Sequence, residues 1–181
     1  DHPTDLIVVP HHSYSKEGSF FRRKSAEPIV RKSGEMALFI PDNCEGFISP
    51  ETGDVSLTKI LVPVDFDPDP QLAANAAMRV ARALGEENVH FTVLHVGTPG
   101  SAPQVNFVKD KEGWTVETIE LEGDPKEVIA KVVQKNKPQL VVMATAGHDS
   151  FLDALRGSVT ERVLRDCRVP LLTIPEHIHL I

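Results

Sequence analysis

The chain has 181 residues, enough for one large domain or for one domain and part of a second. Its residues are 41% hydrophobic and 25% charged, which is typical of a protein with a packed core and a solvated surface. The formal net charge of −7 argues against non-specific binding to nucleic acid or to an anionic membrane, because both attract basic patches. No apolar run approaches the roughly 20 residues of a membrane span. We therefore expect neither nucleic acid nor a membrane among the partners.

The cysteine content and the start of the chain bear on the compartment. Cys44 and Cys167 are far apart and form no CxxC motif, so the sequence predicts no disulfide framework. The start is not typical of a signal peptide, and the expected compartment is a reducing cytoplasm. Because the chain begins at Asp1 rather than at methionine, we expect it to be a piece of a longer protein.

The first 41 residues are expected to form only part of a folding unit. A strand, a short helix and a second strand are predicted at Leu6–Val9, Ser25–Lys32 and Met36–Ile40. Such a set buries too little surface to be stable alone, so it must dock on another unit, on another chain, or on an N-terminal half outside this chain. Residues 42–57 follow as a predicted connector with one tight turn near Pro50 and Gly53.

Residues 58–175 are predicted to form a complete α/β unit, followed by a tail at 176–181. Short apolar runs of strand length alternate with stretches of helical spacing, which predicts a doubly wound, mainly parallel, Rossmann-like sheet. Buried strands are expected at Lys59–Val64, His90–Val96, Leu140–Ala144 and Pro170–Ile174.

Helix boundaries in this unit are marked by capping residues. Asp69-Pro70 supplies an N-cap and a first-turn proline, and Gly85 is expected to end the helix that follows. Asp124-Pro125 opens a second helix in the same way, and a third is expected over Ser158–Arg165.

The stretch Gly97–Leu121 departs from the alternation of strands and helices. Val105–Val108 and Trp114–Leu121 flank Lys111-Glu112-Gly113, a sequence that suits a turn. We therefore predict a β-hairpin here.

Residues 6–41 repeat the pattern of residues 140–175. When Pro41 is placed on Pro175, the two stretches align without a gap. The identities include Leu6 with Leu140, Val8 with Val142, Glu27 with Glu161, Arg31 with Arg165, and Ile40 with Ile174. Matching order, spacing and strand-ending proline favour an internal repeat of which residues 1–41 are the end of the first copy.

The segment from Ala144 to Ser158 joins a buried strand to a helix at the edge of the sheet where open α/β folds bind ligands. Gly147 lets backbone N–H groups approach an anion, while Gly157 and Ser158 stand at a helix N-terminus that favours phosphate. Another interpretation is structural: the glycines only make turns, and Ser158 only caps the helix in a capping box. Spacing alone leaves both interpretations open.

The strand Lys59–Val64 followed by Asp65, the pattern Ala144-x-x-Gly147-x9-Gly157-Ser158, and the tail from Glu161 to Leu172 resemble the universal stress protein family. The resemblance spans about residues 58–175. It implies a five-stranded parallel sheet and, in the nucleotide-binding branch of the family, ATP or a related nucleotide at this loop, with Mg²⁺. Together with the repeat, it implies a tandem member of the family.

The family's loop pattern is Gly-x-x-Gly-x9-Gly-Ser/Thr, from which this chain departs at Ala144. The resemblance implies that Asp65 lies near the ribose or an attached metal ion and that Val96 contacts the adenine. His148 and His95 are expected near the pocket, either bonded to a phosphate or solvated. The family's crossover helix between its second and third strands has no counterpart in this sequence. The predicted nucleotide-binding residues are Asp65, Val96, Ala144, Gly147, His148, Gly157, Ser158 and Val159.

The first copy departs further from the loop pattern. In the same alignment, Pro10, Ser13, Arg23 and Lys24 stand at the positions of Ala144, Gly147, Gly157 and Ser158. Because a proline followed by non-glycine residues does not suit the same turn, we expect no nucleotide there. His11 and His12 with His177 and His179 form a conceivable metal site, but a solvated terminus is the favoured interpretation, and no metal site is predicted.

Three functions remain open on the sequence. The first is a regulatory module that binds ATP or a related nucleotide with little or no catalysis. The second is a scaffold of the same fold that acts through protein–protein association. The third is a slow ATPase using Asp65 or His148, although no known catalytic motif is present. In the family the last strand is often an association edge, so Met36–Ile40 and Leu171–Ile174 are expected to pair within one chain as a pseudo-dimer or between chains as a homodimer.

Overall fold

In the computed structural model, the described part of the chain comprises residues 6–11, 34–42, 44, 46–146, 159, 163 and 168–176. Its elements are β1 (Leu6–His11), β2 (Met36–Pro41), β3 (Lys59–Val64), α2 (Pro70–Ala83), β4 (His90–Val96), β5 (Thr115–Leu121), α3 (Pro125–Asn136), β6 (Leu140–Thr145) and β7 (Leu171–Pro175). The predicted helix at Ser25–Lys32 lies outside the described residues. Of the one predicted at Ser158–Arg165, only Val159 and Val163 are described, and both are helical.

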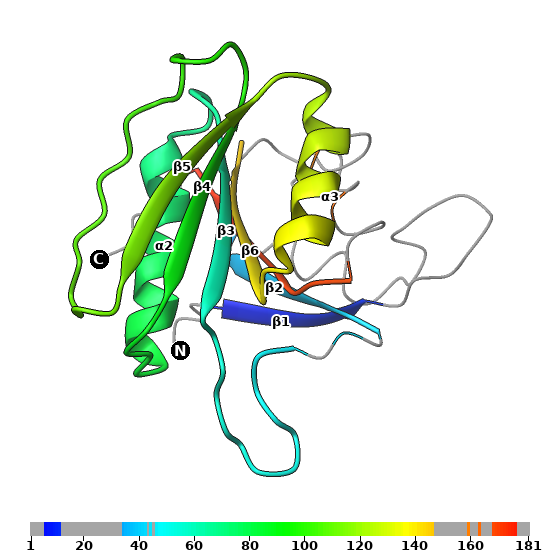
Figure 1. Ribbon diagram of the computed structural model, residues 1–181. Coiled ribbons are helices and arrows are strands. Elements are labelled where there is room, and N and C mark those ends of the chain that lie inside the picture. The colour runs from blue at the N-terminus through cyan, green and yellow to red at the C-terminus, as the bar shows by residue number, and fades with distance from the viewer. Residues whose placement is uncertain are drawn as a thin grey trace, which may run out of the picture.

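All strands of the described residues belong to one seven-stranded sheet with the order β1-β2-β7-β6-β3-β4-β5 (Figure 1). The five strands from β7 to β5 run parallel, as expected for residues 58–175. β1 and β2 are also parallel to each other, but β2 runs antiparallel to β7. β1 and β2 are thus joined through β7 to the strands of residues 58–175 of the same chain. This is the intrachain pairing; pairing between chains was the other arrangement that the sequence left open.

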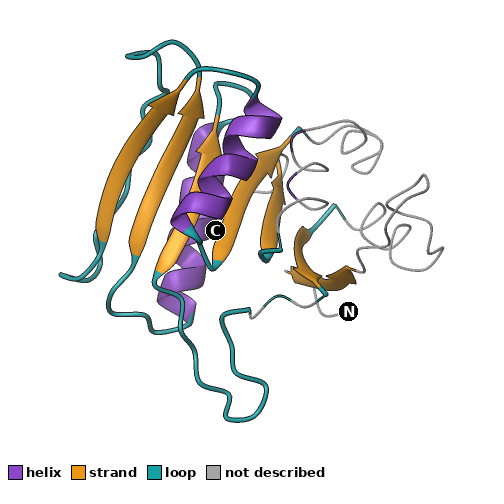
Figure 2. Ribbon diagram, turned by 45° about the vertical axis from the view of Figure 1, so that its right-hand side comes forward, coloured by secondary structure: helices purple, strands orange, loops and turns teal. Residues whose placement is uncertain are grey.

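The helices begin where the capping residues predict. The Asp69 side chain accepts a hydrogen bond from the Gln71 backbone N–H, and Asp124 accepts one from Lys126. α2 ends at Ala83, just before Gly85, whose φ of +72° is the left-handed conformation that suits a helix stop. α2 and α3 cover opposite faces of the sheet (Figure 2).

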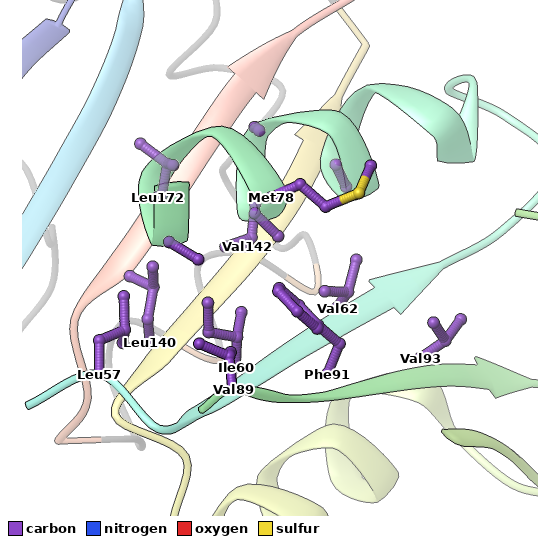
Figure 3. Close-up of a cluster of buried hydrophobic side chains, with 14 of the residues drawn as sticks. Leu57, Ile60, Val62, Met78, Val89, Phe91, Val93, Leu140, Val142 and Leu172 are labelled. Atoms are coloured by element: carbon purple, nitrogen blue, oxygen red, sulfur yellow. The ribbon is translucent and has the colours of Figure 1, made fainter. Parts of the chain in front are cut away.

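Each face of the sheet carries its own hydrophobic core. On the face of α2, small alanines let the helix lie close to the sheet, and Figure 3 shows Met78 of this helix facing residues such as Ile60, Val62 and Val142. On the other face, Ile129 and Val132 of α3 belong to a cluster that includes residues of β1, β2 and β7. β1 and β2 therefore share a core with α3 and with strands of residues 58–175. Among the described residues, no helix is long and apolar enough to cross a membrane.

The predicted hairpin is wrong. Residues 101–110 form no strand, and β5 pairs with β4 in a parallel ladder rather than with a neighbouring hairpin strand. Instead, residues 97–113 run as an extended segment beside α2, which we call the strap (Figure 1). The strap puts Phe107 against Phe91 of β4, with ring centroids 5.2 Å apart. Phe107 is thus packed against the hydrophobic core on the α2 face of the sheet.

The connector contains the predicted tight turn. Ile48 and Val55 form an isolated antiparallel bridge, and Gly53, with a φ of +75°, closes the turn between them. Its N–H donates to the Ser49 carbonyl at 2.9 Å.

Candidate functional site

A cavity of about 280 Å³ lies where β3, β4 and β6 end. The carboxyl ends of parallel strands meet at one edge of a sheet, and ligands of open α/β folds bind there. The N-termini of α2 and α3 also reach this edge, because Pro70 and Pro125 line the cavity. The other described lining residues are Pro63, Val64, Asp65, Asp67, Pro68, Ala73, Leu94, Val96, Ile129, Met143, Ala144, Thr145, Ala146 and Val159.

Half of the predicted nucleotide-binding residues line this one cavity. They come from four separate elements: Asp65 follows β3, Val96 ends β4, Ala144 is in β6, and Val159 belongs to the segment that returns to β7. The other predicted residues, Gly147, His148, Gly157 and Ser158, lie outside the described residues.

Most of the described wall is apolar. Leu94 and Ile129 bring aliphatic groups from β4 and α3, and both are buried. Ala144 is half-buried, so its methyl group takes up space at the position where the family pattern has glycine. A wall of this kind suits the flat face of a base or another apolar ring better than a strongly hydrated group.

Carboxylates supply the charge at the edge of the cavity. Asp65 and Asp67 are both exposed and both line it. One oxygen of Asp65, Oδ1, accepts a hydrogen bond from the Phe66 backbone N–H at 2.9 Å. Ionised carboxylates are acceptors only, so they can receive hydrogen bonds from ligand hydroxyl groups or coordinate a divalent cation.

The helix N-termini at the cavity are already capped. Asp69 and Asp124 accept hydrogen bonds from the first N–H groups of α2 and α3. The first helical residues, Pro70 and Pro125, have no N–H at all. These two helix starts therefore have less capacity to bind an anion than a bare helix end, and the phosphate-binding prediction depends on the loop from Gly147 to Ser158.

His95 is neither solvated nor turned toward a phosphate, contrary to the expectation from the sequence. It is only 4% exposed, and its two ring nitrogens each lie 3.2 Å from an oxygen of the protein, the Val64 carbonyl and the Ser101 hydroxyl. Its neighbours Leu94 and Val96 line the cavity, so the histidine lies on the other face of β4.

Sequence reasoning missed several lining residues. Asp67 lies only two residues after Asp65, and its position in a loop after a strand was a usable signal. Ile129 carried no such signal, since its helical spacing is that of any core residue. Among the residues that the structure describes, no group of three or more His, Cys, Asp or Glu side chains has the arrangement of a metal site. His177 and His179 lie outside that part of the chain.

Comparisons with known proteins agree on one family. Residues 101–175 match the model of the Universal stress protein family. A universal stress protein of Methanocaldococcus jannaschii is 29% identical to this chain over 143 residues, which cover 67% of this chain and 84% of that protein.

Solved structures show the same fold. A universal stress protein from Archaeoglobus fulgidus superposes with a TM-score of 0.67 at 19% identity, covering 95% of this chain. The present chain spans only 62% of the length of that structure. A universal stress protein in complex with cAMP superposes with a TM-score of 0.51 at 18% identity, covering 67% of this chain and 98% of that one.

Proposed function

We propose that the chain, which is similar to universal stress proteins in sequence and in fold, binds an adenine nucleotide in the cavity where β3, β4 and β6 end. In this proposal the protein is a regulatory module with little or no catalysis. The observation that carries it is the convergence of Asp65, Val96, Ala144 and Val159 on one cavity. The family member solved with cAMP supports it only through the shared fold, since the two chains are 18% identical.

In this proposal, several residues that line the cavity have distinct roles in binding. The apolar wall around Leu94 and Val96 receives the base, and the Asp65 carboxylate accepts hydrogen bonds from the ribose hydroxyl groups. The phosphates point toward the loop from Gly147 to Ser158. For a polyphosphate ligand, Mg²⁺ would neutralise part of the charge, and Asp65 and Asp67 offer the oxygen ligands that this ion prefers.

Isothermal titration calorimetry with ATP and with AMP tests the proposal. We expect saturable binding to the native protein and about tenfold weaker binding to Asp65→Asn, because a hydrogen bond to a charged group contributes roughly 1.5–3 kcal/mol. Ala144→Gly should bind more tightly, since it removes a methyl group from the cavity wall. Asp54→Asn, in the connector turn, is the control and should bind like the native protein. Absence of saturable heat with either nucleotide up to millimolar concentration would refute the proposal.

The competing function is a scaffold without a nucleotide. Two observations favour it: Ala144 narrows the cavity at a glycine position, and the strap replaces the crossover helix beside β4 and β5. If both nucleotides fail to bind, the scaffold becomes the better proposal, and self-association through strand edges becomes the activity to measure by analytical ultracentrifugation.

A further inference from the structure

The described wall of the cavity offers few hydrogen-bond donors. Four of its lining residues are prolines: Pro63, Pro68, Pro70 and Pro125. A proline has no backbone N–H to donate. Among the described lining residues, Thr145 is the only one whose side chain can donate, and its hydroxyl donates to the Ile174 carbonyl at 3.4 Å. An ionised phosphate only accepts hydrogen bonds, so this part of the wall offers it little.

The charge on the same wall is negative. Asp65 and Asp67 are the charged residues among the described lining residues, which include no lysine, arginine or histidine. Lys126 follows Pro125 in the sequence but is not one of the lining residues. An anion in the cavity therefore meets two carboxylates without an opposite charge from this part of the wall.

The two helix starts at this edge of the sheet do not reverse the sign of the charge. A helix N-terminus acts as about half of a positive charge. Asp69 and Asp124 cap α2 and α3, and each carboxylate carries a full negative charge against the first N–H groups of its helix. Each helix start is therefore negative by about half a charge, so that with Asp65 and Asp67 the described edge carries about three negative charges.

The apolar and the acidic parts of the wall both suit a nucleoside. Leu94 and Ile129 are buried and present aliphatic surface to a flat ring. The Asp65 carboxylate accepts hydrogen bonds from hydroxyl groups such as those of a ribose. Neither feature attracts a phosphate group.

We infer that the cavity selects adenine ligands of low negative charge, so that adenosine and AMP bind more tightly than metal-free ATP. This inference rests on the proposed function, because it concerns the ligand class of the same cavity. A phosphate group carries up to about two negative charges at neutral pH, and each further phosphate adds charge that the carboxylates repel. Mg²⁺ lowers the charge of the triphosphate, so ATP binds mainly as its magnesium complex.

The expected size of the discrimination follows from the charges. Two like charges about 8 Å apart in water-like surroundings weaken binding by about twofold, and several such pairs act on a triphosphate. We therefore expect metal-free ATP to bind about tenfold more weakly than adenosine, with AMP between the two.

Isothermal titration calorimetry with adenosine, AMP and ATP in the presence of EDTA measures this order. The dependence on salt gives the sign of the interaction. Raising the ionic strength from about 20 mM to about 300 mM screens repulsion, so the affinity for metal-free ATP should rise about threefold while that for adenosine stays constant. At a site that holds phosphate through basic groups, the affinity for ATP would fall instead. Replacing EDTA with Mg²⁺ should strengthen the binding of ATP and leave that of adenosine unchanged.

Variants that remove single charges locate the repulsion. Asp67→Asn and Asp124→Asn each remove one negative charge at this edge, and asparagine still caps α3 in the second variant. Each should raise the ratio of metal-free ATP affinity to adenosine affinity by about twofold. Asp54→Asn is the matched control, because it makes the same change in the connector turn, at the opposite end of β3 (Figure 1), and it should leave this ratio unchanged.

The outcomes separate this inference from the proposed function. Metal-free ATP that binds more tightly than adenosine and loses affinity with salt would overturn the inference while nucleotide binding stands. A ratio that changes equally in Asp54→Asn would also overturn it, since the repulsion would then not come from the cavity. Binding of adenosine without any nucleotide would support the charge selection and refute the proposed function. If neither adenosine nor any nucleotide binds, both fail.

Discussion

Leu38 and Leu172 lie opposite each other where β2 and β7 run antiparallel. The two leucines coincide when residues 6–41 are aligned with residues 140–175. Equivalent residues face each other at the centre of an antiparallel pair when a two-fold axis passes between them. The β2–β7 pairing thus has the geometry of a dimer interface contained in one chain.

The flanking pairs obey the same symmetry. Ala37 pairs with Thr173, and the equivalents of these two residues, Leu171 and Phe39, pair with each other in turn. The parallel ladders match as well, because each pair between β6 and β7 is the equivalent of a pair between β1 and β2. These registers support the interpretation of residues 1–41 as the end of a first copy.

The symmetry gives a matched pair of substitutions in which only the surroundings differ. Leu6 and Leu140 are equivalent, but Leu140 is fully buried beside β3, whereas Leu6 is 40% exposed. Leu140→Ala should lower the free energy of unfolding by about 2–5 kcal/mol, the usual result of leaving a cavity in a core. Leu6→Ala should lower it by less than about 1 kcal/mol. Urea denaturation measures both; equal losses would mean that the outer edge of β1 is covered in solution.

Local sequence signals predicted the strands but not the pairing of β5. The turn signal at residues 111–113 is real, because the Trp114 N–H donates to the Lys111 carbonyl at 3.1 Å. A hairpin and a strap ending in a turn contain the same signal. The difference lies in the partner of β5, which is β4, the strand that precedes the strap in sequence. A partner so far away along the chain cannot be identified from a local pattern.

The candidate site, too, was predicted from the sequence only in part. The family resemblance predicted Asp65 and Val96, and both line the cavity where strand ends of the sheet meet at one edge. Ile129 was not, since its place in the wall depends on how α3 packs against β4. The burial of His95 was also beyond the sequence, because it depends on the strap lying over the end of its strand.

Gln71 attaches the strap to α2 alongside the ion pair between Arg82 and Asp110. Its side-chain amide donates to the Asn106 carbonyl and accepts from the Asn106 N–H, both at 2.9 Å. Gln71→Ala removes both bonds and should speed hydrogen exchange at the Asn106 amide severalfold, with a loss of about 1 kcal/mol in stability. Gln71→Glu keeps the acceptor and should slow this exchange relative to Gln71→Ala. Identical exchange in the two variants would show that other contacts hold the strap.

Gly97→Ala should damage the contact between the strap and His95. The added methyl group meets the ring, and overpacking of this kind costs roughly 1–3 kcal/mol of stability. Removing the ring in His95→Ala makes room for the methyl group, so the double variant should be less destabilised than the sum of the two single variants. Thermal unfolding of the native protein, the two single variants and the double variant completes this double-mutant cycle. Additive losses would mean that the methyl group is accommodated by backbone movement elsewhere.

At the opposite end of β4, the contact between His90 and Glu117 should contribute to stability in a pH-dependent way. Nε2 of His90 lies 3.0 Å from Oε1 of Glu117. This hydrogen bond is the main reason that the pKa of Glu117 lies below its ordinary value of 4.5, helped by the Thr92 hydroxyl and the charge of His90 and opposed by desolvation. A lowered carboxylate pKa stabilises the fold above the ordinary value, and that contribution is lost as the pH falls through the folded value.

Glu117→Gln should therefore flatten the decline of unfolding free energy below about pH 5, where the carboxylates of unfolded chains take up protons. The Glu117 side chain is 47% exposed, so solvent screening keeps the effect under about 1 kcal/mol. His90→Gln breaks the same pair from the other strand and should flatten the curve to a similar extent. Urea unfolding at a series of pH values measures the slopes. A native slope in Glu117→Gln would show that the ion pair does not persist in solution, in which case the His90–Thr115 contact at 2.8 Å would remain to orient the ring.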